Sequence, residues 1–108
     1  MTARLSPMEK EANTRARKGA KYMDVVRPEW YKEVSPDTLE MSNASICILG
    51  QTFSDYWEAL ERLDITDEMA VSLGFIAAGR FDYNKSEVEF ECLTHAWQNE
   101  LMKRRRAM

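Results

Sequence analysis

The chain contains few of the residues on which metal sites and disulfide frameworks are built. Its 108 residues include two cysteines, Cys47 and Cys92, and a single histidine, His95. A disulfide framework or a zinc motif needs more of these residues at regular spacing, and no Cys-x-x-Cys pair is present. We interpret the two cysteines as reduced, partly buried thiols of a cytosolic protein.

Glycine and long apolar runs are also scarce. The four glycines, at positions 19, 50, 74 and 79, never cluster as they do in a phosphate-binding loop. No segment approaches the roughly 20 consecutive apolar residues that cross a bilayer, so no membrane partner is expected. The N-terminus leads into a charged segment, not an apolar one. This pattern predicts no secretory signal and a cytoplasmic location.

The residues that could perform catalysis do not form a recognisable set. Cys92 and His95 are three positions apart, so a helix would place them on one face. Zinc would need both of them, Cys47 and a carboxylate. A thiol and an imidazole on the same helix are also poorly aimed for nucleophilic catalysis. We therefore expect no catalytic residue, no metal and no cofactor, and we predict that the protein is not an enzyme.

Charge is distributed unevenly along the chain. The overall net charge is -3, but residues 1–21 carry +4, residues 22–102 carry -11 and residues 103–108 carry +4. An acidic body therefore has two basic ends. The ends could contact an acidic macromolecule or phosphates, or they could lie against the acidic body of the same molecule.

The candidate binding residues are the basic side chains of the two ends together with two adjacent aromatic residues that could stack on bases. They are Arg15, Arg17, Lys18, Lys21, Trp30, Tyr31, Lys103, Arg104, Arg105 and Arg106. A sequence pI near 5.2 is far from the strongly basic value of a dedicated nucleic-acid-binding domain. Direct nucleic-acid binding is therefore the second hypothesis, after binding to a protein.

Hydrophobic spacing predicts a mainly α fold, a compact domain of four to five helices. Ser6 and Glu9 form a capping-box pattern around Pro7, which predicts the start of a first helix. Its apolar stripe is mostly alanine and buries little surface, so the helix must dock onto something, and a homodimer would provide such a surface. We therefore divide the chain into a basic N-terminal helix or arm, residues 1–26, and a helical core with a basic tail, residues 27–108.

The strongest helical pattern covers residues 45–63, where apolar residues recur every three or four positions. Ser42, Asn43 or Ser45 could cap this helix, and a strand over residues 45–49 is the alternative. Pro28 predicts the start of a short helix that reaches residue 34, after the break at residue 27. Thr66 predicts the start of another short helix that stops at Gly74.

Residues 80–92 support two predictions. Alternating apolar and polar residues on either side of a turn at residues 84–86 are typical of a β-hairpin. Against this, Ser86 and Glu89 form a second capping-box pattern. Phe90, Leu93, Trp97 and Leu101 then keep helical spacing to the basic tail, so we favour a helix from Ser86.

Six short motifs resemble those of a known family. They are the residues Pro28-Glu29-Trp30, Asp37-Thr38-Leu39-Glu40-Met41-Ser42, Cys47-Ile48-Leu49-Gly50-Gln51, Asp55-Tyr56-Trp57, Leu73-Gly74-Phe75 and Leu93-Thr94-His95-Ala96-Trp97. In this order they resemble a family of small uncharacterised proteins encoded by bacteriophages of actinobacteria, mycobacteriophages among them. The resemblance covers residues 28–101, and the basic N-terminal helix and basic tail depart from it.

The resemblance implies a phage accessory protein that is made inside a bacterial host cell. It implies no reaction and no cofactor. Together with the residue patterns, it leads to the hypothesis of a non-enzymatic protein that binds a host or phage macromolecule. A small nucleic-acid-binding regulator that uses the basic termini is the alternative.

Overall fold

The structure is a computed structural model that describes residues 6–79 and 83–107. The described residues form helices and loops and contain no strand, which confirms the predicted mainly α class. The helices are α1 (Pro7–Val26), η1 (Trp30–Lys32, a 3-10 helix), α2 (Ile48–Phe53), α3 (Tyr56–Leu63), α4 (Asp67–Ser72) and α5 (Tyr83–Arg106).

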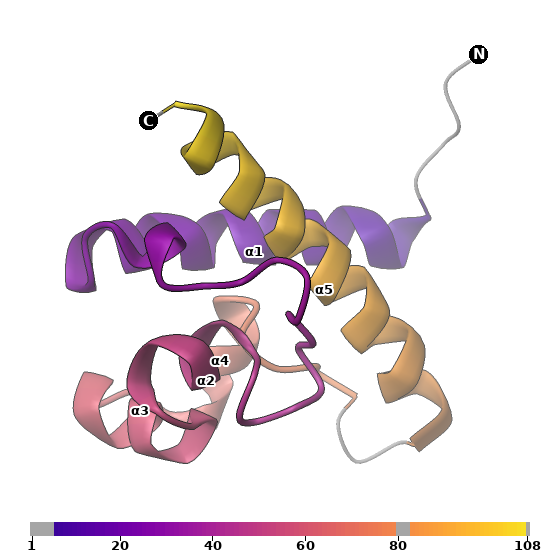
Figure 1. Ribbon diagram of the computed structural model, residues 1–108. Coiled ribbons are helices and arrows are strands. Elements are labelled where there is room, and N and C mark those ends of the chain that lie inside the picture. The colour runs from indigo at the N-terminus through magenta and orange to yellow at the C-terminus, as the bar shows by residue number, and fades with distance from the viewer. Residues whose placement is uncertain (1–5, 80–82, 108) are drawn as a thin grey trace.

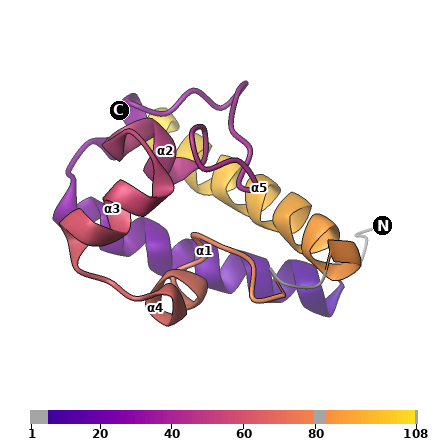
Figure 2. The ribbon, with the colours of Figure 1, turned by 90° about the horizontal axis from the view of Figure 1, so that it is seen from below.

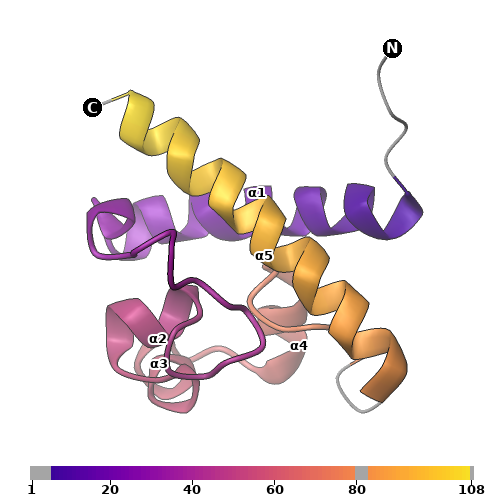
Figure 3. The ribbon, with the colours of Figure 1, turned by 45° about the vertical axis from the view of Figure 1, so that its right-hand side comes forward.

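The two long helices, α1 and α5, cross each other at a steep angle, and the three short helices gather on one side of the crossing (Figures 1 and 3). In the view from below, α4 lies beside α1 (Figure 2). None of the described helices combines the length and the apolar character that a helix spanning a bilayer needs.

Helix α1 begins where the capping box predicts. The backbone N–H of Ser6 donates to Glu9 Oε1 at 3.1 Å, and the N–H of Glu9 donates to Ser6 Oγ at 3.2 Å. The helix then buries its stripe of small residues, Ala12, Ala16, Gly19 and Ala20. Small side chains let two helices approach closely, so this stripe accepts the larger side chains of α5.

The surface onto which α1 docks is therefore supplied by its own chain. The helix belongs to the same core as residues 27–107, although its end coincides with the predicted boundary at residue 26. The alanine stripe consequently gives no reason to invoke a homodimer.

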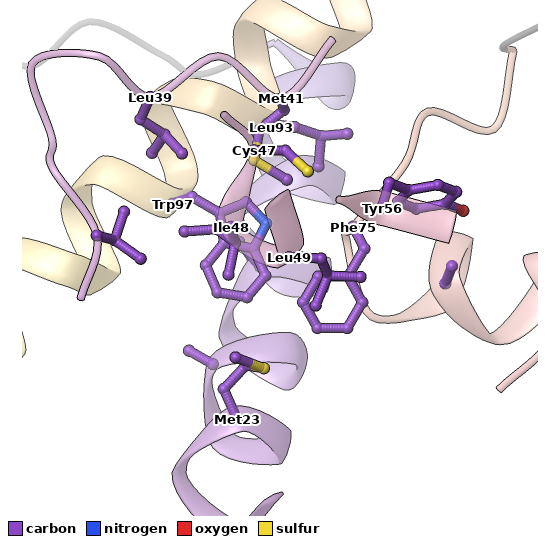
Figure 4. Packing of buried hydrophobic residues seen from close by; sticks show 14 of the residues in the cluster. Met23, Leu39, Met41, Cys47, Ile48, Leu49, Tyr56, Phe75, Leu93 and Trp97 are labelled. Carbon is purple, nitrogen blue, oxygen red and sulfur yellow. The ribbon is translucent and has the colours of Figure 1, made fainter. Parts of the chain in front are cut away.

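Trp97 and Phe75 lie among aliphatic and sulfur-containing side chains in the core of the molecule (Figure 4). The Trp97 ring stacks on Phe75 with centroids 5.4 Å apart, and Trp30 meets Trp97 edge-on at 5.6 Å. The Trp97 indole N–H donates to the carbonyl oxygen of Gly74 at 2.7 Å, so this buried polar group has a partner. Such pairs add to the stabilisation that comes from burying apolar area alone.

The predicted helix over residues 45–63 is wrong in its extent, because it is two helices. Ser54 adopts a positive φ of 87°, outside the helical region, which ends α2 after Phe53. Asp55 then caps α3 by accepting a hydrogen bond from the N–H of Glu58 at 2.8 Å. The cap of α2 is also not a predicted one, because Cys47 Sγ accepts from the N–H of Gly50 at 3.2 Å. No strand forms at residues 45–49.

The segment after Pro28 forms only one short turn, η1, in place of a helix to residue 34. Helix α4 is capped by Thr66 as predicted, and Gly74 ends the segment with φ of 74°. The N–H groups of Gly74 and Phe75 donate to the carbonyl groups of Val71 and Ala70, the pattern of a glycine-terminated helix.

Residues 83–92 of the alternative hairpin prediction lie in helix α5, so the hairpin is wrong for these residues. The predicted start at Ser86 is also three residues late, since α5 begins at Tyr83. Residues 80–82, the rest of the hairpin prediction, lie outside the described residues.

Gly19 lies where α1 packs tightly against the Leu73 backbone and the Trp97 ring. A Cβ at this position would collide with the carbonyl oxygen of Leu73 and lie 2.6 Å from Trp97 Cζ2. We predict that Gly19→Ala lowers the free energy of unfolding by about 1–3 kcal/mol, because overpacking outweighs the better helix propensity of alanine. Denaturant unfolding followed by circular dichroism measures this, with Glu11→Ala on the exposed face of α1 as the control. A Gly19→Ala protein as stable as the wild type would contradict the packing described.

Candidate binding surface

The crossing of α1 and α5 brings the two basic ends of the sequence together. A groove of about 210 Å³ lies between the helices and is lined by Asn13, Arg17, Asn99, Glu100, Lys103 and Arg106. We call it the basic groove. Lys21 continues the Arg17 side of α1 one turn further on and is exposed. Two regions about 80 residues apart in the sequence, each with a net charge of +4, thus meet at one surface.

The cations of the basic groove differ in how far they are already neutralised. Within the described part of the chain, no ion pair involves Arg17, Lys21 or Arg106. Among the residues that the structure describes, Arg106 makes only a long contact, 3.4 Å, from Nε to the carbonyl oxygen of Met102 on its own helix. Lys103 pairs with Glu100 at 3.0 Å but keeps more than half of its side chain exposed. The groove therefore presents mostly uncompensated positive charge.

Arg104 has a structural role instead. Its Nε and Nη2 atoms donate to the two carboxylate oxygens of Asp24 at 2.9 and 2.8 Å, and Nη1 reaches Glu100 at 3.1 Å. The hydrogen bonds from Arg104 hold the pKa of Asp24 below its ordinary value, although partial burial opposes this, and the Trp30 indole N–H adds a further bond. Arg104 therefore fastens the end of α5 to the end of α1.

Arg105 also has a structural role. Its Nε donates to the carbonyl oxygen of Tyr31 at 3.1 Å and its Nη2 to that of Val34 at 2.7 Å. These bonds satisfy one backbone oxygen within η1 and one in the segment after it, where regular secondary structure offers few partners. Half of the basic tail is thus used to hold the fold together.

Arg15 is buried and forms the central ion pair of the molecule. Its Nη1 lies 2.8 Å from Glu89 Oε2, and both side chains are about nine-tenths buried. The remaining donors reach the carbonyl oxygens of Val71 at 2.7 Å and Ile76 at 2.6 Å. Lys18, one turn further on, is exposed and donates to Ser72 Oγ at 3.2 Å. Arg15 is therefore not placed to contact a partner.

The two aromatic candidates do not lie in the basic groove. Trp30 is fully buried, with its indole N–H on Asp24 and its ring against Trp97. Tyr31 is half-buried and meets the Trp30 ring edge-on. A fully buried indole cannot stack on a base, so Trp30 leaves the set of candidate contact residues.

The basic groove continues into a larger polar groove along the same two helices. This second groove, about 430 Å³, shares Asn13 and Asn99 with it and also contains Glu9, Glu91, Cys92, His95 and Gln98. Burial raises the pKa of the Cys92 thiol, and the charges of Glu9, Glu91 and Glu89 raise it further. The protonated thiol, which is the poor nucleophile, is therefore favoured at neutral pH.

Cys47 does not join Cys92 and His95. Its thiol is buried at the start of α2, where it caps the helix, and burial raises its pKa. Within residues 6–79 and 83–107, no three or more histidine, cysteine, aspartate or glutamate side chains form a group that could hold a metal ion. The described surface instead offers grooves lined by charged and amide side chains.

Sequence reasoning missed Asn13, Asn99 and Glu100, which line the basic groove together with the cations. Asn13 and Arg17 are four residues apart, as are Asn99 and Lys103, so helical spacing alone could have placed each pair on one face. No local signal shows that the two faces meet.

Comparison with known proteins gives no relative from which a role could be transferred. The chain matches no protein-family model, no curated protein and no solved structure. The functional argument therefore depends on the geometry of this molecule.

The Arg15–Glu89 pair predicts a specific response to acid. Burial alone would raise the pKa of Glu89, but the hydrogen bonds from Arg15, Ala78 and Gly79, with the charge of Arg15, outweigh it and lower the pKa below 4.5. A carboxyl whose pKa is lower in the folded state stabilises the protein above its unfolded-state pKa. That stabilisation is lost as the pH falls through the folded-state pKa.

We predict that the wild type loses stability progressively below about pH 4.5. Glu89→Gln should be less stable at neutral pH and should decline less steeply with acid. Denaturant unfolding as a function of pH measures both effects, with Glu11→Gln as the control. An unchanged acid profile in Glu89→Gln would show that another carboxyl controls it.

Proposed function

We propose that this protein is a non-enzymatic accessory protein of a bacteriophage, and that it binds a host or phage protein in the cytoplasm of a bacterial host. The observation that supports the proposal is the basic groove, where Arg17, Lys103 and Arg106 from opposite ends of the chain line one surface. The bacterial and phage setting follows from the resemblance of residues 28–101 to the actinobacteriophage family.

Clustered like charges repel one another, and this repulsion disfavours the folded state unless a partner of opposite charge is bound. In this molecule the acidic body neutralises Arg15 and Arg104 and leaves Arg17 and Arg106 without an ion pair among the described residues. An acidic partner would relieve the repulsion in the groove. Asn13 and Asn99, which also line the groove, could add hydrogen bonds that depend on the shape of the partner.

The thiols are compatible with this location. Cys47 and Cys92 are both free in the structure. Free thiols persist in the reducing cytosol, whereas exported proteins tend to form disulfides.

A first experiment tests the basic groove as a protein-binding surface. We expect Arg17→Glu with Arg106→Glu to reduce capture of acidic partner proteins from a lysate of a phage-infected actinobacterial host by about tenfold or more, since charge reversal replaces attraction by repulsion. Quantitative mass spectrometry of the captured proteins provides the measurement.

The matched control is Lys32→Glu with Arg62→Glu, which makes the same change in net charge at exposed residues of η1 and α3. Capture that is equal for the two double variants would show that overall charge, not the basic groove, governs binding. Failure of the wild type to capture any protein above background would refute the proposed function.

A small nucleic-acid-binding regulator is the second candidate, and the same groove favours it because phosphates bind arginine and lysine. Because Trp30 is buried and cannot stack on bases, such binding would rely on phosphate contacts and would be strongly salt-dependent. We expect a gel-shift titration with duplex DNA at low salt to show weak binding that Arg17→Glu with Arg106→Glu abolishes. No shift at low salt would end this second hypothesis.

A further inference from the structure

A different surface, beside the first half of α5, combines an exposed tryptophan with an apolar pocket. Trp57 is 63% exposed, whereas Trp30 and Trp97 are fully buried. The exposed ring leaves a large apolar area uncovered, which a bound partner could bury. Nothing in the structure of α3 requires the exposure, since the neighbouring Tyr56 is buried and supports the Trp57 ring edge-on at 4.9 Å.

Trp57 borders a pocket of about 130 Å³, which we call the Trp57 pocket. Its apolar lining comes mainly from Met41, Tyr56, Trp57, Ile76 and Phe90. Pockets that hold a drug-sized ligand usually measure about 300–1,000 Å³. The Trp57 pocket is below that range, and its size suits a single large apolar side chain.

An acidic groove of about 380 Å³ adjoins the Trp57 pocket and shares Ser42 and Phe90 with it. We call it the glutamate groove. Glu40 projects from the loop before α2, and Glu87 and Glu91 project from α5. All three are exposed, and none has an ion-pair partner among the described residues.

The glutamates are arranged unfavourably for the isolated chain. Glu87 and Glu91 are one helical turn apart, and like charges at this spacing destabilise a helix. Glu40 adds a third negative charge from across the groove. Lysine or arginine residues of a bound segment would convert this repulsion into attraction, so the groove selects for a basic occupant.

We propose that the Trp57 pocket and the glutamate groove together bind a segment of a partner protein that presents one large apolar side chain next to lysine or arginine residues. The apolar side chain enters the pocket beside Trp57, and the basic residues lie along Glu40, Glu87 and Glu91. The pocket supplies affinity through desolvation, as central aromatic residues of interfaces do, and the glutamates supply selectivity.

This surface shares no lining residue with the basic groove, although the larger polar groove adjoins both and shares Glu91 and His95 with the glutamate groove. Glu87 and Glu91 precede Lys103 on α5 by three turns or more, and Trp57 lies on α3, which does not contribute to the basic groove. The proposal therefore does not depend on the proposed function.

The test is selection of a displayed library of random linear peptides on the full chain. We expect the enriched peptides to share a large apolar residue within a few positions of two or more lysines or arginines. Trp57→Ser should weaken binding of such a peptide about tenfold or more, and Glu87→Lys with Glu91→Lys should do the same. Raising the salt concentration should weaken wild-type binding, because the glutamates are exposed.

Intrinsic fluorescence gives a second readout. Trp57 is the tryptophan that a neutral quencher such as acrylamide can reach, because Trp30 and Trp97 are buried. Binding of an enriched peptide that contains no tryptophan should therefore protect the fluorescence from quenching. Val25→Ala, which removes another exposed apolar side chain on α1, should leave both affinity and protection unchanged.

Several outcomes would overturn the proposal. They are the absence of enriched peptides, enrichment of peptides without basic residues, and equal binding by the Trp57→Ser and wild-type proteins. Light scattering that shows self-association abolished by Trp57→Ser would assign the pocket to a second copy of this chain instead. Arg17→Glu with Arg106→Glu should not affect peptide binding, so failure here is distinguishable from failure of the proposed function.

Discussion

The ion pair between the buried Arg15 guanidinium and Glu89 is the interaction on which the rest of the structure depends. Arg15 lies on α1, pairs with Glu89 on α5, and donates to the carbonyl oxygens of Val71 and Ile76 at the end of α4 and after it. Glu89 in turn accepts from the N–H groups of Ala78 and Gly79. A pair this deeply buried is favourable only when its remaining hydrogen-bonding groups are satisfied, and here the surrounding loop satisfies them. One ion pair thereby fixes how three segments meet.

The close contact of α1 with α5 and the Gly74 turn has a second consequence. It allows Trp97 to lie between Phe75 and Trp30, with its N–H on Gly74, and it requires glycine at position 19. It also determines which cations remain available. Arg15 and Arg104 lie where the acidic body reaches them, whereas Arg17 and Arg106 project from the crossing. The charge segregation seen in the sequence thus serves two purposes, cohesion of the fold and display of a basic groove.

The two surfaces of the molecule have opposite electrostatic character. The basic groove lies at one end of the α1–α5 crossing, and the glutamate groove lies beside the first half of α5, next to the exposed Trp57. Because the two surfaces have opposite sign, a partner of the charge proposed for one surface is repelled by the other. Both are built on α5, which holds them at a fixed separation.

Local signals in the sequence determined much of the secondary structure. The Ser6–Glu9 capping box, the Thr66 cap and the Gly74 stop act within one helical turn, so they were readable without the fold. The Asp55–Glu58 cap was equally local, but the continuous apolar periodicity across it hid the break at Ser54. Only the tertiary structure decided which of the candidate binding residues are buried and which are available to a partner. Whether Arg15, Trp30 or Arg105 is buried or free depends on groups about 67 to 74 residues away, and no local pattern specifies such contacts.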